Sequence, residues 1–482
     1  MRCAMVKTTI PRVLIVGTTP EAGKSLVVLG LLLALRKQGL SVSCCITGQA
    51  LQKALLYSRV TRRYTRVLDQ ELLGRSELLR ALSQASLGAD IVIVDGRDGI
   101  FDPASSGDAS ASDVDFALQT GTPIILVHEP TATTDSIGQL VSSFVQRKDS
   151  LSVGGLIANK LPPVPEGLSS PQHPWVVALN QILESAHLPR VLGEIPVGTL
   201  SGQLPSSTLS QDENMSLLSR QFFVEVESLV GRNIDLDMLR QIAATAANLQ
   251  VAATLKQHAT RVCRFAVTDD TCFSLCYQDN LDLLRYFGAD IVPFSPLADS
   301  ALPRRVGGLY VTGAYLKSYG ADLSRNENLR RSIKAFADAG GVVYSEGAGT
   351  AYLCRSFQLE QGGPSYPGVG LIPAEAFPVQ RASSLLEAET VDDSVLGFSG
   401  ITLGGMSLGD WTLRGLHTGS GHHIVNTLRV RIPGQEPVTE GYSATAQSCS
   451  TFHLLHFGSN PQVAKSLVDA AQVAERSVPS SD

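Results

Sequence analysis

The stretch Val13-Leu-Ile-Val-Gly-Thr-Thr-Pro-Glu-Ala-Gly-Lys-Ser25 decides the fold of the N-terminal half of the chain. An apolar run with the form of a buried strand leads into a glycine-bounded loop, which ends in Gly23-Lys24-Ser25 as a helix begins. The backbone N–H groups of such a loop, the positive end of the helix, a lysine ammonium and a serine hydroxyl together suit a nucleoside triphosphate with magnesium. We therefore predict a phosphate-binding loop rather than an ordinary strand-to-helix turn.

The spacing of this loop departs from the common Gly-x4-Gly-Lys pattern, because Gly17 stands one residue too early and Thr18 occupies the first-glycine position. The sequence predicts magnesium ligands at Ser25 and at Asp95, the acid that ends the apolar run Ala89–Asp95, with Asp98 and Asp102 as weaker candidates. The residues predicted to contact the nucleotide are Gly17, Thr18, Thr19, Glu21, Ala22, Gly23, Lys24 and Ser25.

Composition limits the other possibilities. The chain has 482 residues, which suggests two domains or three. Its net charge of −6 gives no general attraction for nucleic acid, so we expect no nucleic-acid partner. The longest apolar run, Leu26–Leu35, is about half of the roughly 20 residues that span a bilayer, so no membrane association is expected. The scattered cysteines and the absence of a signal-peptide pattern favour a cytoplasmic location.

Apolar runs alternate with helical segments along the chain, which is typical of α/β units with a mostly parallel sheet and helices on both faces. Predicted strands of the first unit cover 12–17, 40–46, 89–95, 122–128, 154–159 and 190–196, and predicted helices cover 24–38, 72–86, 135–145 and 175–185. A surface loop is expected over 200–215 and a connecting helix over Leu229–Leu255. Predicted strands of the second unit cover 261–267, 291–293, 308–311 and 341–345, and predicted helices cover 280–287 and 326–339.

Further motifs follow in a fixed order. They are Asp95-Gly96 with Gly99-Ile-Phe-Asp102, Asp279-Asn-Leu281, Phe294-Ser-Pro-Leu297, Gly308-Leu-Tyr310 and His456-Phe457. Together with the phosphate loop, these motifs resemble the cobyrinic acid a,c-diamide synthase family over nearly the whole chain. The unusual spacing after Gly17 is similar to that family's own loop.

The resemblance implies a phosphate-loop ATP-binding domain of the dethiobiotin-synthetase type, followed by a class I glutamine amidotransferase-like domain. It also implies ATP and Mg²⁺ as cofactors and a tetrapyrrole as substrate. A homodimer is compatible with the resemblance, because members of the family often dimerise. In the family, ATP phosphorylates a tetrapyrrole carboxylate, and ammonia released from glutamine displaces the phosphate. The domains implied for this chain are 10–235 for the ATP-binding domain, 236–258 for a helical linker, 259–475 for the amidotransferase-like domain and 476–482 for a tail.

The glutaminase residues of the family are missing from this sequence. Its turn Glu-Cys-Gly-Gly corresponds to Glu346-Gly-Ala-Gly349, so Gly347 takes the nucleophile's position, and a glycine supplies no thiolate. The register set by His456-Phe457 puts Leu454 at the histidine's position. His453 is adjacent, but a shift of one residue in a strand turns a side chain to the opposite face. We therefore predict no catalytic residue in this site.

Two other features support the loss. The family's Gly-Gly-Tyr-Pro-Glu loop corresponds to Gly313-Ala-Tyr-Leu-Lys317. Cys354, the nearest thiol, is seven residues along the expected helix, roughly 10 Å from the turn at 1.5 Å per residue, and is read as a core cysteine.

The synthetase half also departs from the family. The family's Lys-x-Gly-Pro-Asp-Tyr-Ile-Asp-Pro corresponds to Cys45–Lys53, where Gln49 and Gln52 replace acids, and no Asp or Glu lies between Glu21 and Asp69. A neutral amide neither holds magnesium comparably nor takes a proton. Three hypotheses remain: an ATP-binding regulator or partner of an active enzyme, an amide ligase on a tetrapyrrole that uses free or partner-supplied ammonia, and a plain phosphate-loop ATPase.

Overall fold

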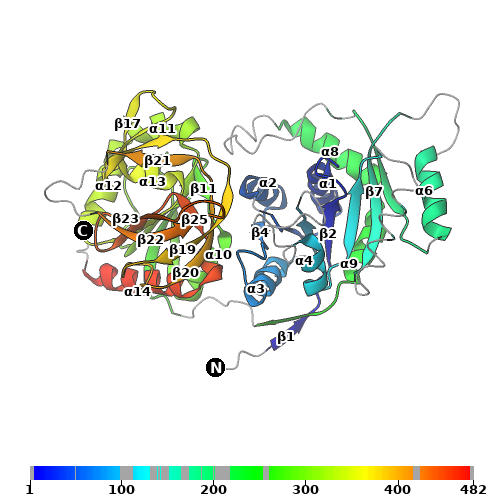
Figure 1. Ribbon diagram of the computed structural model, residues 1–482, viewed down its shortest axis with the longest axis horizontal. Helices are drawn as coiled ribbons and strands as arrows, with labels where there is room; N and C mark the ends of the chain where they lie inside the picture. The colour runs from blue at the N-terminus through cyan, green and yellow to red at the C-terminus, as the bar shows by residue number, and fades with distance from the viewer. Residues whose placement is uncertain are drawn as a thin grey trace. The chain divides into compact units, whose positions relative to one another are not determined.

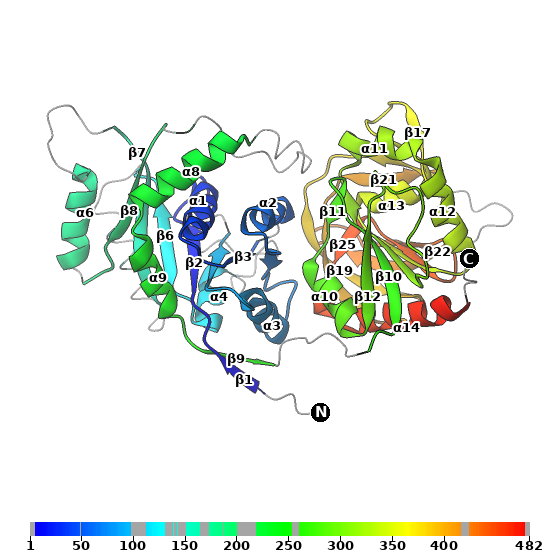
Figure 2. The ribbon, with the colours of Figure 1, turned by 180° about the vertical axis from the view of Figure 1, so that it is seen from behind.

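The computed structural model describes residues 5–48, 50–97, 112–130, 138, 142, 151–163, 173–185, 187–198, 200, 218–252, 260–415 and 424–477. The chain divides near residue 254 into two compact units, which are described separately (Figures 1 and 2). In the described part of the chain, no helix combines the length and the hydropathy that crossing a bilayer requires.

The centre of the first unit is a seven-stranded sheet in the order β4-β3-β5-β2-β6-β7-β8, in which every neighbouring pair is parallel. Helices α1 and α8 pack together on one side of this sheet, and α3 and α9 lie on the other (Figures 1 and 2). The predicted doubly covered parallel sheet is therefore confirmed. The strands are β2 (Arg12–Gly17), β3 (Val42–Ile46), β4 (Arg66–Val67), β5 (Ile91–Asp95), β6 (Ile124–His128), β7 (Val153–Leu161) and β8 (Val191–Pro196). The helices are α1 (Lys24–Lys37), α2 (Leu51–Thr61), α3 (Arg75–Ser86), α4 (Asp113–Thr120), α6 (Pro174–Ser185), α8 (Arg220–Asn233) and α9 (Leu236–Ala244).

Strand β2 is fully buried and lies between β5 and β6. Its neighbours run parallel to it, so the carboxyl ends of β5, β2 and β6 meet at one edge of the sheet, where open α/β sheets bind their ligands. The loop that follows Gly17, the acid Asp95 at the end of β5 and His128 at the end of β6 are thereby brought together.

The predicted continuous helix over Leu229–Leu255 is wrong. The chain leaves α8 at Ile234, whose backbone is extended (φ −123°, ψ 134°), and Asp235 then caps α9 by accepting a hydrogen bond from the backbone N–H of Met238. Strand β9 (Leu249–Ala252) follows and pairs antiparallel with β1 (Met5–Thr8). The helix predicted over 135–145 lies almost wholly outside the described residues, as does the loop predicted over 200–215.

A buried arginine, Arg12, connects several segments at the amino end of the central strand β2. The Arg12 side chain on β2 is fully buried, and its guanidinium donates to Thr122 Oγ1 at 2.9 Å, to the Ala247 carbonyl at 2.7 Å and to the carbonyls of Ile10 and Thr120. Burial lowers the pKa of Arg12 to about 10. One side chain thus ties the central strand to the end of α4 and to the segment after α9.

The second unit contains a ten-stranded sheet in the order β12-β10-β13-β15-β24-β23-β22-β19-β20-β25, parallel from β12 to β24 and antiparallel thereafter. Successive residues of its parallel strands enter two different cores, with Phe265 and Tyr310 in one and Ala266 and Leu309 in the other, as the alternation of side chains along a strand requires. The strands are β10 (Cys263–Thr268), β12 (Ala289–Phe294), β13 (Gly308–Val311), β15 (Val342–Ser345), β19 (Ser384–Thr390), β20 (Thr402–Ser407), β22 (Val425–Arg431), β23 (Val438–Ser443), β24 (Ser448–Ser450) and β25 (His453–Leu455).

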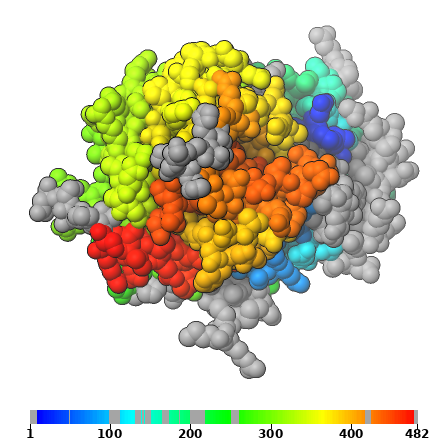
Figure 3. All heavy atoms as spheres, turned by 60° about the vertical axis from the view of Figure 1, so that its left-hand side comes forward, coloured from blue at the N-terminus to red at the C-terminus, as the bar shows by residue number. Residues whose placement is uncertain are grey.

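Smaller elements complete this unit. Its helices are α10 (Gln278–Tyr286), α11 (Leu316–Arg325), α12 (Glu327–Asp338), α13 (Ala348–Leu353), α14 (Gln462–Ser477) and the 3-10 turn η2 (Phe457–Ser459). Its smaller sheets pair β11 (Phe273–Leu275) with β14 (Gly313–Ala314), and β16 (Cys354–Gln358) with β17 (Ser365–Pro367) and β18 (Ile372–Pro378), which in turn pairs with β21 (Trp411–Arg414). Figure 3 shows α14 in red on the surface of this unit, and the helix continues to Ser477, two residues into the predicted tail.

The buried side chain of Glu346 connects strands of the large sheet at the point where the sheet curls. Strands β24 and β25 occupy the fifth and the last position of the sheet, yet only residues 451 and 452 separate them, so the sheet must curl. Glu346, directly after β15, accepts hydrogen bonds from the hydroxyls of Tyr310 and Tyr344 and from the backbone N–H of Leu455 in β25. Burial raises the pKa of Glu346 to about 8, although the three donors lower it in part.

We expect Arg12→Met to destabilise the first unit by about 3 kcal/mol, because it leaves buried carbonyls without a donor. Trp175 is the only tryptophan of this unit, so urea unfolding followed by its fluorescence in a Trp411→Phe background measures the change. Arg240→Met is the matched control, since Arg240 is exposed and pairs with Asp237 one turn away, and it should shift stability by less than about 0.5 kcal/mol. Equal stability of the two variants would contradict the role given to Arg12.

The stability of the second unit should depend on pH through Glu346. Between the ordinary glutamate pKa and about 8, the folded protein binds a proton that the unfolded chain does not, so stability falls as the pH rises through this range. Glu346→Gln replaces the titratable carboxyl group with a neutral amide, so its free energy of unfolding does not fall with pH for this reason. The free energy of unfolding of the variant minus that of the wild type should therefore increase from acidic pH to above pH 8. Trp411 fluorescence in a Trp175→Phe background follows this unit, and a difference that stays constant with pH would contradict the raised pKa.

Candidate functional site

The loop after β2 has the backbone of a phosphate cradle. The Thr18 N–H donates to the Val127 carbonyl at 3.0 Å, and Gly23 adopts a positive φ of 77° directly before α1 begins at Lys24. A Cβ atom at Gly23 would lie 2.3 Å from Asn159 Nδ2, so both the backbone conformation and the space require glycine. The predicted loop residues Gly17 to Ser25 are thus brought together at the start of one helix.

Two residues of β7 fix this loop, and the sequence did not predict them. Asn159 Nδ2 donates to the Ala22 carbonyl at 2.8 Å, and Lys160 Nζ donates to the Glu21 carbonyl at 2.6 Å while pairing with Glu129 at 2.7 Å. The one signal in the sequence was that Asn159 ends a predicted strand, where polar residues reach the ligand edge of a parallel sheet.

His128, at the end of β6, also holds the loop. Its Nδ1 atom lies 2.8 Å from Thr18 Oγ1, and its ring stacks against Trp175. Burial lowers the pKa of His128 to about 4, so the ring is neutral at physiological pH. It therefore positions Thr18 through a neutral hydrogen bond.

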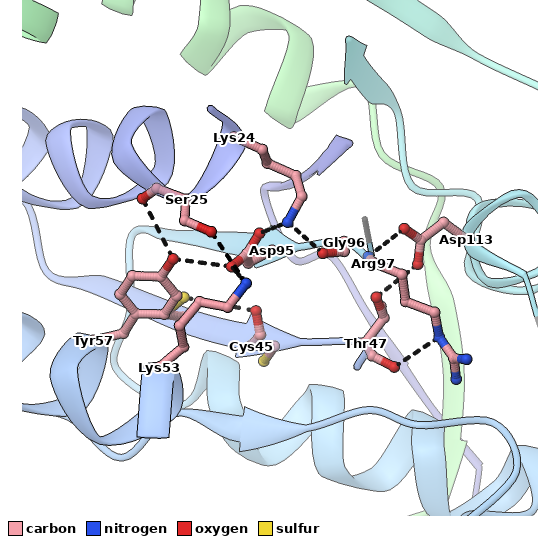
Figure 4. A network of polar contacts seen from close by, with 11 residues as sticks. Lys24, Ser25, Cys45, Thr47, Lys53, Tyr57, Asp95, Gly96, Arg97 and Asp113 are labelled. Carbon is pink, nitrogen blue, oxygen red and sulfur yellow. Dashed lines mark hydrogen bonds and ion pairs between the residues drawn. The ribbon is translucent and has the colours of Figure 1, made fainter. Parts of the chain in front are cut away.

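Lys24 and Asp95 form a buried ion pair at the centre of the site (Figure 4). Lys24 Nζ lies 2.5 Å from Asp95 Oδ1 and donates to the Gly96 carbonyl at 2.6 Å. Burial acts to raise the pKa of Asp95, but the ammonium groups of Lys24 and Lys53 and the hydrogen bonds that the carboxylate accepts lower it below its ordinary value. Asp95 is therefore a carboxylate, as the predicted metal-side acid must be.

A second lysine reaches the same carboxylate from α2, a helix that the sequence did not predict. Lys53 Nζ lies 3.4 Å from Asp95 Oδ2 and 3.1 Å from Ser25 Oγ, and the Tyr57 hydroxyl donates to Asp95 Oδ2 at 2.9 Å. The structure thus brings together the two predicted magnesium ligands, Ser25 and Asp95, but the Lys53 ammonium contacts both of them (Figure 4).

This donor set fits a phosphate chain better than it fits a metal. Lys24, Lys53 and the N-terminus of α1 supply positive charge, whereas magnesium prefers carboxylate oxygens and water. Among the described residues, no group of three or more His, Cys, Asp or Glu side chains is arranged to hold a metal ion. With Lys53 in this position the residues do not fit magnesium at Ser25 and Asp95, and that metal site stays a prediction.

A second acid lies beyond Gly96. Asp113 accepts hydrogen bonds from Thr47 Oγ1 and from the Arg97 backbone N–H, both at 2.6 Å, and burial raises its pKa to about 6. Arg97 also pairs with the buried Asp69 at 2.9 Å. The replaced acid position Gln52 lies in α2, and the candidates Gln49, Asp98 and Asp102 lie outside the described residues.

In the second unit, the two altered positions Gly347 and Leu454 meet next to Gly313, the first residue of the altered loop. Gly347 forms a sharp turn between β15 and α13 with φ 56° and ψ −143°. A Cβ atom at Gly347 would lie 3.2 Å from Gly313 Cα and 3.3 Å from Leu454 Cδ2. The turn that would present a nucleophile is therefore kept, but a buried leucine faces it where the resemblance puts a histidine.

The neighbouring reactive groups are used elsewhere. His453 pairs with Glu440 at 3.0 Å between Nε2 and Oε2. Cys354 is the first residue of β16 rather than part of the preceding helix, which corrects the predicted position, because α13 ends at Leu353. Its thiol is buried and donates to the Thr350 carbonyl, and burial raises its pKa, so it is not a reactive thiolate.

Two family models match the chain. Residues 2–137 match a P-loop domain described as a domain of unknown function, and residues 264–398 match the CobB/CobQ-like glutamine amidotransferase domain. The first match covers the phosphate loop and strands β2 to β6, and the second covers the part of the second unit that contains the glycine turn.

Curated relatives align over both units. The cobyrinate a,c-diamide synthase of Leptospira interrogans serovar Lai is 27% identical over 96% of this chain and 98% of its own length. That of Syntrophotalea carbinolica is 28% identical over 95% and 98%, respectively. That of Limosilactobacillus reuteri is 30% identical over 81% of this chain and 83% of its own length. With this degree of identity over both units, the chain belongs to the cobyrinate a,c-diamide synthase family.

Proposed function

We propose that this protein binds ATP but has lost glutamine-dependent amidation, and that it acts as a regulatory or partner subunit of an active enzyme. The observation that carries the proposal is the meeting of Gly347, Gly313 and Leu454 at the point where a glutaminase needs its thiolate and its histidine. The proposed loss concerns the catalytic side chains alone, since the turn at Gly347 keeps the sharp geometry that would present a nucleophile.

The absence of a nucleophile cannot be compensated nearby. Glutamine hydrolysis of this type requires a thiolate and a base within hydrogen-bond reach of each other. The thiol of Cys354 is engaged with a backbone carbonyl, and His453 is engaged with Glu440. In the described structure, neither group contacts Gly347. We therefore expect this unit to keep the amidotransferase fold without hydrolysing glutamine.

The nucleotide side supports ATP binding. The glycine backbone, the start of α1 and the Lys24 ammonium are arranged as a phosphate cradle, and family membership implies the same ligand. ATP-dependent docking on a related active enzyme or on a tetrapyrrole in the cytoplasm is the role that this combination suits.

The retained cradle also favours a second candidate. An ATP-dependent amide ligase could use free or partner-supplied ammonia and would not need the lost glutaminase. It would need a group that activates a carboxylate, and the replaced acids around Gln52 argue against it. Incubation with ammonium salt, ATP and cobyrinic acid tests it, since each converted carboxyl lowers the mass by about one unit and an unchanged mass would exclude it for this substrate.

We expect the purified protein to release no ammonia from glutamine, even with ATP and cobyrinic acid present, because the turn at Gly347 carries no nucleophile. The Leptospira relative, assayed in parallel, is the positive control. Gly347→Cys alone should also be inactive, since Leu454 supplies no base, and the double variant Gly347→Cys/Leu454→His tests whether these two groups are the missing ones. Measurable turnover by the wild-type protein would refute the proposal.

Lys24→Met should weaken ATP binding by about ten- to a hundredfold, since a charge-assisted contact to phosphate is worth roughly 1.5–3 kcal/mol. Isothermal titration calorimetry measures the affinity, and circular dichroism checks that the variant is folded. Lys37→Met is the matched control, because Lys37 ends the same helix and pairs with Glu227 on the surface. A folded Lys24→Met variant with wild-type affinity would show that the loop does not bind nucleotide.

A further inference from the structure

Lys53 lies between the two side chains that hold magnesium in other phosphate-loop proteins. Phosphate-loop proteins hold magnesium between the serine or threonine of the loop and an aspartate on a neighbouring strand. Here those groups are Ser25 and Asp95, and Lys53 Nζ lies 3.1 Å from the Ser25 hydroxyl and 3.4 Å from Asp95 Oδ2 (Figure 4). The ammonium therefore contacts the two oxygens that a metal would bind.

Helix α2 holds this lysine in place. Lys53 and Tyr57 are four residues apart and so lie on the same face of the helix. The buried Tyr57 hydroxyl donates to Asp95 Oδ2 at 2.9 Å and meets the Ser25 carbonyl at 3.4 Å. Burial, and next the negative charge of Asp95, raise the pKa of Tyr57 well above its ordinary value, so it remains a donor. Both carboxylate oxygens of Asp95 are therefore occupied by donors.

The charges at this point also oppose a divalent cation. In the described part of the chain, Asp95 is the only carboxylate that hydrogen-bonds or ion-pairs with Lys24, Ser25 or Lys53. Before a nucleotide binds, two ammonium groups thus face one carboxylate directly, while the more distant Asp113, which also interacts with the charge of Lys24, accepts hydrogen bonds from Thr47 and the Arg97 N–H. The sequence between Glu21 and Asp69 offers no further acid. A magnesium ion would have to displace one ammonium while next to another.

We propose that the Lys53 ammonium replaces the magnesium ion, so that this site binds the triphosphate of ATP without a divalent metal. The inference rests on the proposed binding of a nucleotide at this loop. The ammonium groups of Lys24 and Lys53 would both pair with oxygens of the phosphate chain, and the Ser25 hydroxyl would donate a hydrogen bond to a phosphate oxygen instead of coordinating a metal ion through its own oxygen. The two ammonium groups supply the positive charge that holds the nucleotide. Because one ammonium neutralises less charge than a divalent ion, it stabilises the transition state of phosphoryl transfer less, and ATP hydrolysis should be slow.

Calorimetric titration of ATP into the wild-type protein and Lys53→Met, in EDTA and in excess magnesium, tests the inference. The wild-type protein should bind ATP in EDTA, and its apparent affinity should not rise when magnesium is added, because magnesium converts free ATP into a complex whose metal this site does not need. Lys53→Met should lose about tenfold or more in EDTA, equivalent to about 1.4 kcal/mol, and should regain affinity with magnesium because Ser25 and Asp95 are then free to bind it. Lys37→Met, on the surface of α1, should behave as wild type in both conditions.

The outcomes separate this inference from the proposed function. Wild-type protein that binds ATP only with magnesium would overturn the role of Lys53 and leave nucleotide binding intact. Folded Lys53→Met with wild-type affinity in EDTA would overturn it as well. Absence of ATP binding in both conditions would refute the proposed function itself. Thermal unfolding of each variant establishes that it is folded.

Discussion

The burial of Asp95 is the constraint on which the arrangement of the first unit depends. A carboxylate with almost no exposed surface is stable only when it is paired and hydrogen-bonded, since an unpaired buried ion costs several kcal/mol. Its partners come from separate elements, Lys24 from α1 and Lys53 with Tyr57 from α2. The phosphate loop, α2 and β5 therefore have to meet in one geometry. The same contacts that stabilise the fold define the electrostatics of the site.

In the second unit, the geometry of the turn at Gly347 is maintained by residues that carry no catalytic role. The turn at Gly347 has a positive φ, which glycine adopts at little cost, while a side chain there would be strained. The preceding residue, Glu346, links β13, β15 and β25 through the two tyrosine hydroxyls and the Leu455 N–H. Because this network lies beneath the turn and contains no catalytic group, it maintains the turn whether or not glutamine is hydrolysed.

Much of this organisation could be predicted from local sequence. The apolar run before Gly17, the acid at Asp95 and the alternation of strands and helices depend on neighbouring residues, and the structure agrees with them. Leu454 lies beside Gly347 in the structure. That it takes the position of the family's histidine, as the strand register indicates, stays a prediction.

Some of the failures arise from contacts between distant residues, and others from local signals that were overlooked. Asn159 and Lys160 hold a loop about 137 residues earlier in the chain, and no local pattern indicates such a pairing. Helix α2 buries Leu51, Ala54, Tyr57 and Val60, which recur at helical spacing, so this helix was indicated by a local pattern that the sequence analysis overlooked. The break at Ile234 depends on the cap at Asp235, which a reading of helical propensity over Leu229–Leu255 overlooked.

The changes in the two units are consistent with each other when the chemistry is considered as a whole. Amidation needs an activated carboxylate and a supply of ammonia, and an acyl phosphate formed without ammonia is lost to water. A chain that had lost its glutaminase at Gly347 but kept rapid metal-assisted phosphoryl transfer would consume ATP without product. An ammonium at the metal position keeps affinity for the phosphate chain while removing the ion that bridges and polarises it. In our proposal, Lys53 and Gly347 are thus two parts of one change, from using the nucleotide to responding to it.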